Sequence, residues 1–385
     1  MFELLQLPDL RHGPTESARP KYERLKEHLL GEMRQGRLKP GTALPSEKRI
    51  AELLNIARST VRQAMASLEQ DGVISRIHGK GTFVQEQALQ RLRNESGLYA
   101  LVVPETQYGF YPSLLRSFGE SAEQVHHQIV VCNTNNDVDK QGNAILQLID
   151  HEVAGVAIVP TTVPTTPAFQ IRQLQKHGIP VVFCSRRVDE IRAPLLAIPF
   201  EEVGYRAGCA ALEAGHRKAA FFGTHRARST VAYEAGFRRA LKESGDSKTR
   251  LECFCGGAPS PAVADHEEEF GAALRKLVID RKDPPTVIFA GFDSLAELLF
   301  LQLTRAGYRV PANISLISFG GTQRGQAIVR QLTAVTVDEV GMGQRAIDLL
   351  DRMRSGALPL ESEETFDLDL TINAGSTLGP PPGGG

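Results

Sequence analysis

The sequence predicts an α/β protein in which a small helical domain precedes a larger domain of two lobes, each built on a parallel sheet. Three observations predict this fold class. The chain has 385 residues, which is too long for one ordinary core. Residues 20–85 combine three amphipathic helical patterns with a short hairpin pattern. After residue 97, continuous apolar runs alternate with helical stretches, which is typical of parallel strands covered on both faces.

The composition is that of a soluble globular protein, with 42% hydrophobic and 23% charged residues. Its apolar runs are far shorter than the roughly 20 residues that cross a bilayer, so we expect no membrane partner. Five cysteines imply no disulfide framework, and Cys253 and Cys255 have no second Cys or His pair beside them. We therefore expect reduced thiols, a cytoplasmic location, no metal site and no cofactor.

Composition also suggests the domain boundaries. Residues 1–19 lack the basic start, apolar run and cleavage site of a signal peptide, so we interpret them as a flexible leader. Residues 86–97 are polar and are interpreted as a linker between domain 20–85 and domain 98–375. The end of the chain, 376–385, contains "GPPPGGG" and is expected to be disordered.

The elements of the first domain follow in order. An apolar stripe predicts a helix over Tyr22–Met33, and the glycines and proline of "GRLKPG" end it. "LPSEKRIAELL" restarts a helix with Ser46 as its N-cap and Ile50, Leu53 and Leu54 turned inward. A short turn at 55–57 precedes a third amphipathic helix, which ends before a glycine. "VISRIHGKGTFV" then predicts two strands around a turn. This order is that of a winged helix-turn-helix.

The charges of this domain favour double-stranded DNA as its partner. Between Lys21 and Glu86 stand twelve Lys or Arg and eight acids, while the whole chain has a net charge of −1. The second helix of a helix-turn-helix lies in the major groove with its first turn at the base edges. Arginines there suit guanine edges and phosphates, and hydroxyls suit phosphates. The expected DNA-binding residues are Lys48, Arg58, Ser59, Thr60, Arg62, His78, Gly79 and Lys80. The alternative is a solvated three-helix module that binds another protein.

The run "RSTVRQAMASLEQDGVISRIHGKGTFV", with "LPSEKRIAELL" before it, resembles the GntR family of bacterial transcription regulators over residues 20–85. The resemblance implies DNA contacts from Lys48, Arg58, Ser59, Arg62, His78 and Gly79. The chain departs from the family pattern at Ala57, where the family usually has Ser or Thr, and at Gln63, where it usually has Glu. Loss of the helix cap at position 57 costs on the order of 1 kcal/mol.

In the second domain the apolar runs and helical stretches are too many for one compact sheet, which favours two α/β lobes. We expect helices at 113–126, 139–151, 169–177, 201–214, 233–244, 294–306 and 340–354, and a long helix that ends at Asp280. Ligands of such sheets bind at the carboxyl ends of the strands, here between the lobes.

This region resembles the LacI-type effector domain, which is periplasmic-binding-protein-like, through motifs such as "AGVAIVP", "GIPVVFCSRR" and "FAGFDSLAELLFLQLTRAGYRVPANISLISFGG". A GntR head on such a body is an arrangement known for repressors of sugar-utilisation genes. The resemblance implies effector contacts from Phe110, Tyr111, Arg186 and Asp293.

Several polar positions of the LacI-type pocket are changed in this chain. The family's acidic, amide and arginine side chains are replaced at Ser185, Pro199, Phe200, Tyr233, Gly320 and Gly321. A sugar hydroxyl buried without a partner weakens binding. Either the effector is less polar than a free sugar, or other side chains replace the lost ones, or the pocket responds to no small molecule. The candidate replacements are His225, Arg228, Gln323 and Arg324.

The function that follows is a sequence-specific DNA-binding transcription regulator. We expect a repressor of sugar or carbohydrate catabolic genes that binds its operator as a homodimer under control of a small-molecule effector. An enzyme is disfavoured, because the sequence has no nucleophile elbow, phosphate loop, zinc-protease helix or dinucleotide fingerprint. A solute-binding protein is disfavoured by the DNA-binding head.

Overall fold

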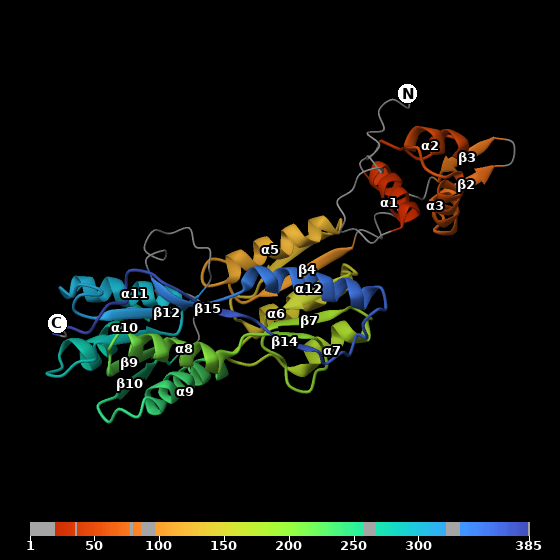
Figure 1. Cartoon of the computed structure of the whole chain (residues 1–385). Helices are drawn as coiled ribbons and strands as arrows, with labels where there is room; N and C mark the ends of the chain where they lie inside the picture. Colours follow the sequence, from red (N-terminus) through yellow and green to blue (C-terminus); the bar gives the residue numbers. More distant parts are fainter. Residues whose placement is uncertain are drawn as a thin grey trace. The chain divides into compact units, whose positions relative to one another are not determined.

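The computed structural model describes residues 20–34, 37–77, 80–85, 97–257, 266–320 and 332–383 (Figure 1). The chain divides into two compact units, Met1–Gly97 and Leu98–Gly385. The expected leader 1–19, and the expected linker 86–97 apart from Gly97, lie outside the described residues. None of the described helices is long and apolar enough to cross a membrane.

The described part of the first unit has three helices and a small antiparallel sheet of order β1-β3-β2. Its elements are α1 (Lys21–Arg34), β1 (Ala43–Leu44), α2 (Glu47–Leu54), α3 (Arg58–Gln70), β2 (Ile74–Ile77) and β3 (Gly81–Val84). The three helices bury the apolar stripes seen in the sequence, including Leu25 and Met33 of α1 and Met65 and Leu68 of α3. The two-residue strand β1 was not predicted.

Local chemistry places the ends of α2 and α3. The Ser46 side chain accepts a hydrogen bond from the amide of Arg49 at 3.2 Å, which confirms the predicted N-cap of α2. Asn55 ends α2 in the left-handed region, with φ 50°, and Gly72 follows α3 with φ 66°. One prediction was wrong, because Leu53 is 40% exposed. Ile50 and Leu54, four residues apart, take the inward face of this short helix.

The second unit contains two α/β lobes, as predicted, and each lobe has a six-stranded sheet. The N-terminal lobe has the strand order β14-β8-β7-β6-β4-β5, and its strand pairs are all parallel. Its strands are β4 (Leu98–Val103), β5 (Gln128–Asn133), β6 (Gly155–Ile158), β7 (Val181–Ser185), β8 (Leu195–Ala197) and β14 (Thr365–Asp367). Its helices are α5 (Tyr111–Gln124), α6 (Val138–Asp150), α7 (Ala168–Lys176) and α12 (Glu339–Arg354).

The C-terminal lobe has the strand order β10-β9-β11-β12-β13-β15, with β15 antiparallel to β13. Its strands are β9 (Lys218–Gly223), β10 (Arg250–Cys255), β11 (Val287–Ala290), β12 (Ser315–Gly320), β13 (Thr333–Val337) and β15 (Leu370–Asn373). Its helices are α8 (Phe200–Glu213), α9 (Arg228–Glu243), α10 (Glu267–Leu274) and α11 (Asp293–Arg305). The long helix expected before Asp280 is α10 followed by a π-helical turn at Arg275–Ile279.

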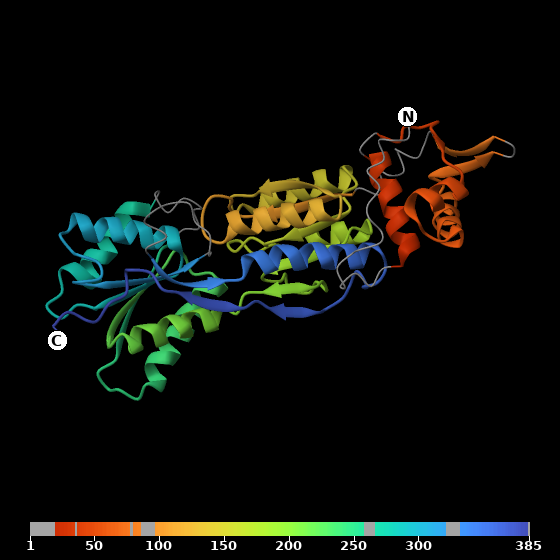
Figure 2. The ribbon, with the colours of Figure 1, turned by 45° about the horizontal axis from the view of Figure 1, so that its top comes forward.

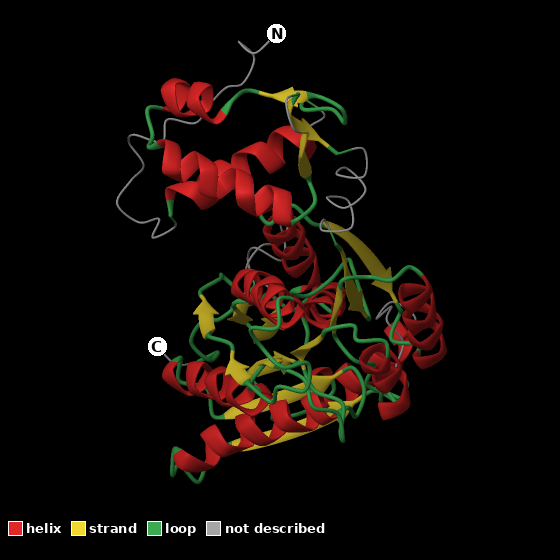
Figure 3. Ribbon diagram, turned by 90° about the vertical axis from the view of Figure 1, so that its right-hand side faces the viewer, coloured by secondary structure: helices red, strands yellow, loops and turns green. Residues whose placement is uncertain are grey.

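The chain passes between the lobes three times, after β8, after β13 and between β14 and β15. In Figure 2 the C-terminal segments, in blue, run along both lobes, and Figure 3 shows strands lying between helices. Residues alternate along the buried strands: Tyr99 and Leu101 of β4 face one core cluster, and Ala100 and Val102 face another. The first of these clusters continues into the C-terminal lobe, where it contains Phe289.

The predicted disorder of 376–385 is wrong for the described part, Ser376–Gly383. Thr377 is 3% exposed, and its hydroxyl donates to the carbonyl of Leu316 and accepts from the amide of Thr333. The carbonyl of Gly379 accepts a hydrogen bond from the hydroxyl of Ser315 at 3.1 Å. The tail therefore satisfies backbone and side-chain groups at the starts of β12 and β13 in the C-terminal sheet, despite its Pro and Gly content.

Candidate functional site

The predicted recognition edge begins where α3 begins. Arg58 and Arg62 lie on its first two turns, and their side chains are 61% and 63% exposed. Beneath them the apolar positions of α3 are buried in the core of the first unit. Lys48, Ser59 and Lys80 are exposed and Thr60 is half-buried, whereas His78 and Gly79 lie outside the described residues. The exposed residues are therefore available to an external partner.

Glu47, which the sequence analysis did not single out, lies close to three arginines at this edge. Glu47, the first residue of α2, lies 3.7 Å from Arg58, 3.5 Å from Arg62 and 3.3 Å from Arg76 of β2. Arg76 also pairs with Glu69 of α3 at 3.2 Å. The "SEKR" start of α2 contains Glu47 beside a cap, but its contact with three arginines depends on tertiary structure.

The start of α3 lacks a side-chain cap, as the sequence predicted. Ala57 occupies the N-cap position with extended backbone, and no side-chain hydrogen bond caps the helix. The first turn of a helix carries amides without intrahelical acceptors. In this chain those amides lie at the predicted DNA-facing edge, next to the exposed Ser59.

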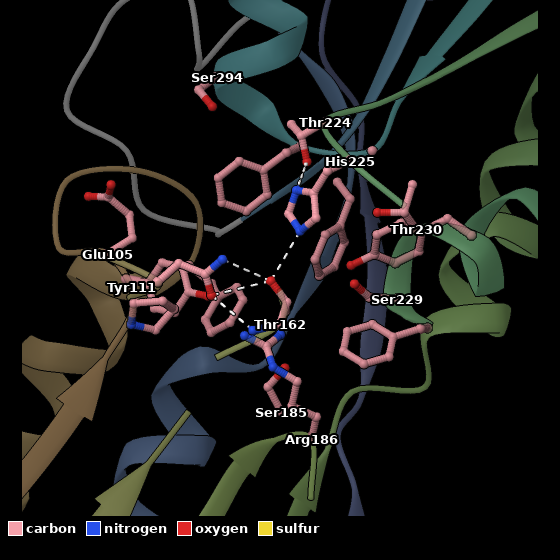
Figure 4. A pocket seen from close by; sticks show the side chains of 18 residues that line it. Glu105, Tyr111, Thr162, Ser185, Arg186, Thr224, His225, Ser229, Thr230 and Ser294 are labelled. Atoms are coloured by element: carbon pink, nitrogen blue, oxygen red, sulfur yellow. Dashed lines mark hydrogen bonds between the residues drawn. The ribbon is translucent and has the colours of Figure 1, made fainter. Parts of the chain in front are cut away.

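A cavity of about 140 Å³ lies between the lobes of the second unit, at the carboxyl ends of their parallel strands (Figure 4). The N-terminal lobe contributes residues that follow β4, β6 and β7, and the C-terminal lobe contributes residues that follow β9 and β11. The lining residues are Pro104, Glu105, Phe110, Tyr111, Asn136, Thr162, Ser185, Arg186, Phe200, Thr224, His225, Ser229, Thr230, Tyr233, Gly291, Phe292, Ser294 and Phe319.

Three of the four predicted effector residues line this cavity, and Asp293 does not. Phe110 and Tyr111 begin α5, and their rings lie 4.4 Å apart between centroids. Asp293 is 1% exposed and accepts a hydrogen bond from Ser318 at 2.7 Å. A Cβ on Gly320 would lie 1.6 Å from the Asp293 carboxylate. Because Gly320 has no side chain, the Asp293 carboxylate can occupy this buried position.

Arg186 reaches the cavity because the chain turns sharply at the end of β7. Ser185 has φ 73°, and the amide of Arg186 donates to the carbonyl of Cys184 at 2.9 Å. The Arg186 Nε then donates to the carbonyl of Pro160 at 2.7 Å. The two terminal nitrogens of the guanidinium carry the remaining N–H groups.

A chain of polar contacts crosses the cavity from one lobe to the other (Figure 4). His225 lies 3.2 Å from the Thr224 hydroxyl through Nδ1 and 3.0 Å from the Thr162 hydroxyl through Nε2. The amide nitrogen of Asn136 donates to the same Thr162 hydroxyl at 2.9 Å. Thr162 can then donate to Nε2, and a neutral His225 can donate from Nδ1 to Thr224. Of these residues the sequence analysis had named only His225.

The buried environment shifts the titration of these groups. Burial raises the pKa of Tyr111, and the nearby Arg186 opposes that rise. Burial also raises the pKa of Tyr233 far above its ordinary value. The pKa of His225 is lowered by burial and then by the positive charge of Arg186. The tyrosines are therefore neutral hydroxyl groups near neutral pH, and the neutral form of His225 is favoured.

A second interlobe contact lies beside the cavity. Arg228, at the start of α9, makes a bidentate pair with Asp189 of the N-terminal lobe, with N–O distances of 3.1 and 2.8 Å. Both side chains are exposed. They also line an adjoining cavity of about 460 Å³, which shares Thr162, Arg186, Phe200 and Ser229 with the first.

Within the described ranges no group of three or more His, Cys, Asp or Glu side chains is placed to hold a metal ion. The cysteines described are free thiols, and Cys253 and Cys255 lie half-buried on β10. The four residues that were expected to replace the lost pocket residues do not all lie in the same place. His225 lines the first cavity and Arg228 the second, while Gln323 and Arg324 lie outside the described residues.

Comparison with known proteins matches both units. Residues 21–84 match the family described as bacterial regulatory proteins, gntR family, and residues 210–368 match a periplasmic binding protein-like domain. The chain carries a GntR-type head on a periplasmic-binding-protein-like domain. It is a DNA-binding transcription regulator.

Relatives of this regulator align with two thirds or more of its chain. An arabinose metabolism transcriptional repressor from Geobacillus stearothermophilus is 26% identical over 341 residues, 88% of this chain and 92% of that protein. The transcriptional repressor PurR from Pectobacterium carotovorum is 25% identical over 264 residues, 68% of this chain and 75% of that protein. These relatives are regulators, not enzymes.

A solved structure of a periplasmic binding protein/LacI transcriptional regulator from Alkaliphilus metalliredigens, complexed with D-xylulofuranose, has the same fold as the second unit. Its TM-score is 0.61 at 18% identity, and the match covers 73% of this chain and 99% of that one. At this identity the match establishes the fold.

Proposed function

We propose that this regulator is a cytoplasmic, homodimeric repressor of sugar or carbohydrate catabolic genes, with Lys48, Arg58, Ser59, Thr60, Arg62, His78, Gly79 and Lys80 at the operator. The observation that carries the proposal is that one chain joins an exposed arginine edge on α3 to a small cavity between two lobes. The nature of the relatives supports it, since one is a repressor of arabinose metabolism and one solved structure holds a pentulose.

The domain limits that we propose are 20–85 for the head and 98–375 for the effector-binding and dimerisation body. A symmetric dimer presents two recognition helices to two half-sites, so the operator should be a pseudo-palindrome. An effector that binds one lobe arrangement better than another shifts the population toward it and so changes operator affinity. Phe110, Tyr111 and Arg186 are the proposed effector contacts, and Asp293 is withdrawn as a direct one.

The test is operator binding by the full chain. Genomic fragments selected by the wild-type protein give a footprint, and the double variant Arg58→Ala/Arg62→Ala is compared on the same site. We expect its specific footprint to disappear, because two groove-facing cations are lost. A matched control removes two exposed cations elsewhere in the head, Lys21→Ala/Lys39→Ala. If the arginine variant keeps wild-type affinity and salt slope, α3 is not the recognition helix.

A further inference from the structure

We propose that the effector carries an anionic group, a carboxylate or a phosphate on a small polyhydroxylated molecule, which binds Arg186 at the converging helix starts of the cavity. This inference rests on the proposed function, because it assigns the chemical class of that effector. It also gives a physical reason for the altered polar residues of the pocket.

The first observation is the placement of helix N-termini. The first turns of α5, α8, α9 and α11 all contribute residues to the cavity: Tyr111, Phe200, Ser229 and Thr230, and Ser294. None of these helices has a side-chain N-cap hydrogen bond, whereas α6 and α12 are capped by Asp137 and Asp338. Each helix start carries about half a positive elementary charge and unfilled amide donors. An anion is the ligand that such starts favour.

The second observation is a cation without an acidic partner. Arg186 is half-buried, lines both cavities and makes no ion pair with a carboxylate in the part of the chain that the structure describes. Its Nε is used by the carbonyl of Pro160, and Tyr111 interacts with the guanidinium. A guanidinium presents further donors in a fork that matches carboxylate and phosphate oxygens.

The third observation is a pair of buried hydroxyls. Thr230 is 5% exposed and Tyr233 is 6% exposed, and both line the cavity. Neither hydroxyl makes a hydrogen bond to another described residue, and Figure 4 shows none at the labelled Thr230. The methyl group of Thr230 faces Gly223, where an added Cβ would lie 2.3 Å from it. Buried hydroxyls are normally satisfied, so these two are available to a ligand.

The acids near the cavity are already engaged. Glu105 accepts hydrogen bonds from the backbone amides of Thr106, at 2.6 Å, and Gln107. Asp293 is turned away toward Ser318. Glu201 and Glu202 of the first turn of α8 pair with Arg239 and Arg206 and are not among the lining residues. The lining groups with free donors are thus the guanidinium, the hydroxyls and the helix amides.

The experiment compares matched neutral and anionic ligands on the full chain. One set is D-glucose, D-gluconate and D-glucose 6-phosphate, and the other is D-xylose, D-xylonate and D-xylose 5-phosphate, all at ionic strength matched with sodium chloride. We expect an anionic member of a set to raise Tm where its neutral parent does not. The aldonates and the phosphates separate a carboxylate from a phosphate as the recognised group.

Variants locate the binding. Arg186→Met should weaken binding of the stabilising anion on the order of ten- to hundredfold, because a hydrogen bond to a charged group is lost. Tyr233→Phe keeps the ring and should weaken it by about tenfold without lowering the ligand-free Tm. Arg116→Met, an exposed arginine of α5 that lines neither cavity, should leave the affinity unchanged.

Three results would overturn the proposal: stabilisation by neutral sugars equal to that by anions, no stabilisation by any anion beyond chloride, or full anion affinity in both Arg186→Met and Tyr233→Phe. The operator footprint of the ligand-free protein is measured in parallel. A normal footprint with any of these results rejects the anionic effector and leaves the proposed function standing. Loss of the footprint in the wild type rejects the proposed function itself.

Discussion

At the scale of single residues, Glu47 places one negative charge among the arginines of the recognition edge. It lies within 3.7 Å of Arg58, Arg62 and Arg76, and its own side chain is only 19% exposed. Exposed ion pairs add little to stability, at most about 1 kcal/mol each. The arrangement instead gives three flexible cations a shared anchor, which lowers the cost of ordering them on DNA.

We predict that Glu47→Gln weakens discrimination between operator and non-operator DNA. Loss of one negative charge should raise affinity for a scrambled duplex a few-fold, since non-specific binding follows net charge. Affinity for the operator should rise less, because the arginines are no longer held together. Fluorescence anisotropy with both duplexes at several salt concentrations measures the ratio. Glu52→Gln, an exposed acid of the same helix, is the control, and an unchanged ratio in Glu47→Gln contradicts the anchoring role.

His216 gives the second unit a predictable dependence on pH. The residue is 1% exposed and its ring lies between Thr286, at 2.8 Å, and the carbonyl of Gly379, at 2.8 Å. Burial lowers its pKa below the ordinary 6.5, with a partial opposing effect from that carbonyl. The unfolded chain therefore binds more protons than the folded chain between the two pKa values, so stability rises with pH there.

We expect the Tm of the second unit to fall as pH drops below 6.5 toward the folded-state pKa of His216. His225 shifts in the same direction and adds to the effect. Calorimetry of the wild type and of His216→Gln across pH 5 to 8 separates the contribution of His216 from that of His225. The variant should lose part of the dependence of Tm on pH. An equal slope in both proteins would show that other groups dominate.

At the scale of elements, the start of α3 is the weak point of the head. Without a cap at Ala57, its first-turn amides have no side-chain acceptor, and the helix should fray more readily there. We predict that Ala57→Ser stabilises α3 by about 1 kcal/mol. Hydrogen exchange of the peptide that contains Ser59 and Thr60 should slow by roughly fivefold.

A matched control for the cap is Ala66→Ser, an exposed position in the interior of the same helix. Serine there should slightly destabilise α3, because its hydroxyl competes for backbone groups. If both variants protect the first turn equally, or if Ala57→Ser changes nothing, another group already caps the helix.

The long elements could be predicted because their apolar patterns are decisive. A buried strand such as β6, with every residue buried, gives a continuous apolar run between two helical stretches. The short strands β1 and β14 carry no such pattern; β14 has the mostly exposed sequence Thr365–Asp367. The tail was misjudged because Pro and Gly content says nothing of a buried partner for Thr377. Composition indicates the local preference of a segment, whereas the contacts of Thr377 depend on residues that are distant in the sequence.

Part of the candidate site could also be predicted from the sequence. Tyr111 and Arg186 follow strand ends, and strand ends meet at one edge of a parallel sheet, so their convergence follows from sequence. The direction of the Asp293 side chain could not be predicted, because it depends on the space left by Gly320 at the end of the neighbouring strand β12. The Glu47 cluster likewise depends on the packing of α2, α3 and β2.

At the scale of the whole molecule, the lobes of the second unit are coupled in two different ways. Near the three chain crossings a continuous buried cluster spans both lobes, and apolar packing there is costly to open. At the cavity the polar links include the contact of His225 with Thr162 and the exposed pair of Asp189 with Arg228, beside a ring contact of Phe110 with Phe319. Contacts of this kind cost little to break, so opening of the lobes should begin at the cavity side.

A charge swap across the lobes tests this coupling. Asp189→Arg places two arginines opposite each other and should speed hydrogen exchange of residues 161–166 and 224–231, which flank the cavity, by a few-fold. The double variant Asp189→Arg/Arg228→Asp restores an opposite-charge pair and should return exchange toward the wild-type rate. Both effects should fade at about 1 M salt, where the screening length is about 3 Å. Glu363→Arg, which breaks the pair with Arg192 within one lobe, should leave these segments unchanged. Faster exchange that the double variant does not reverse would mean that Asp189 acts on its own lobe and not across the cavity.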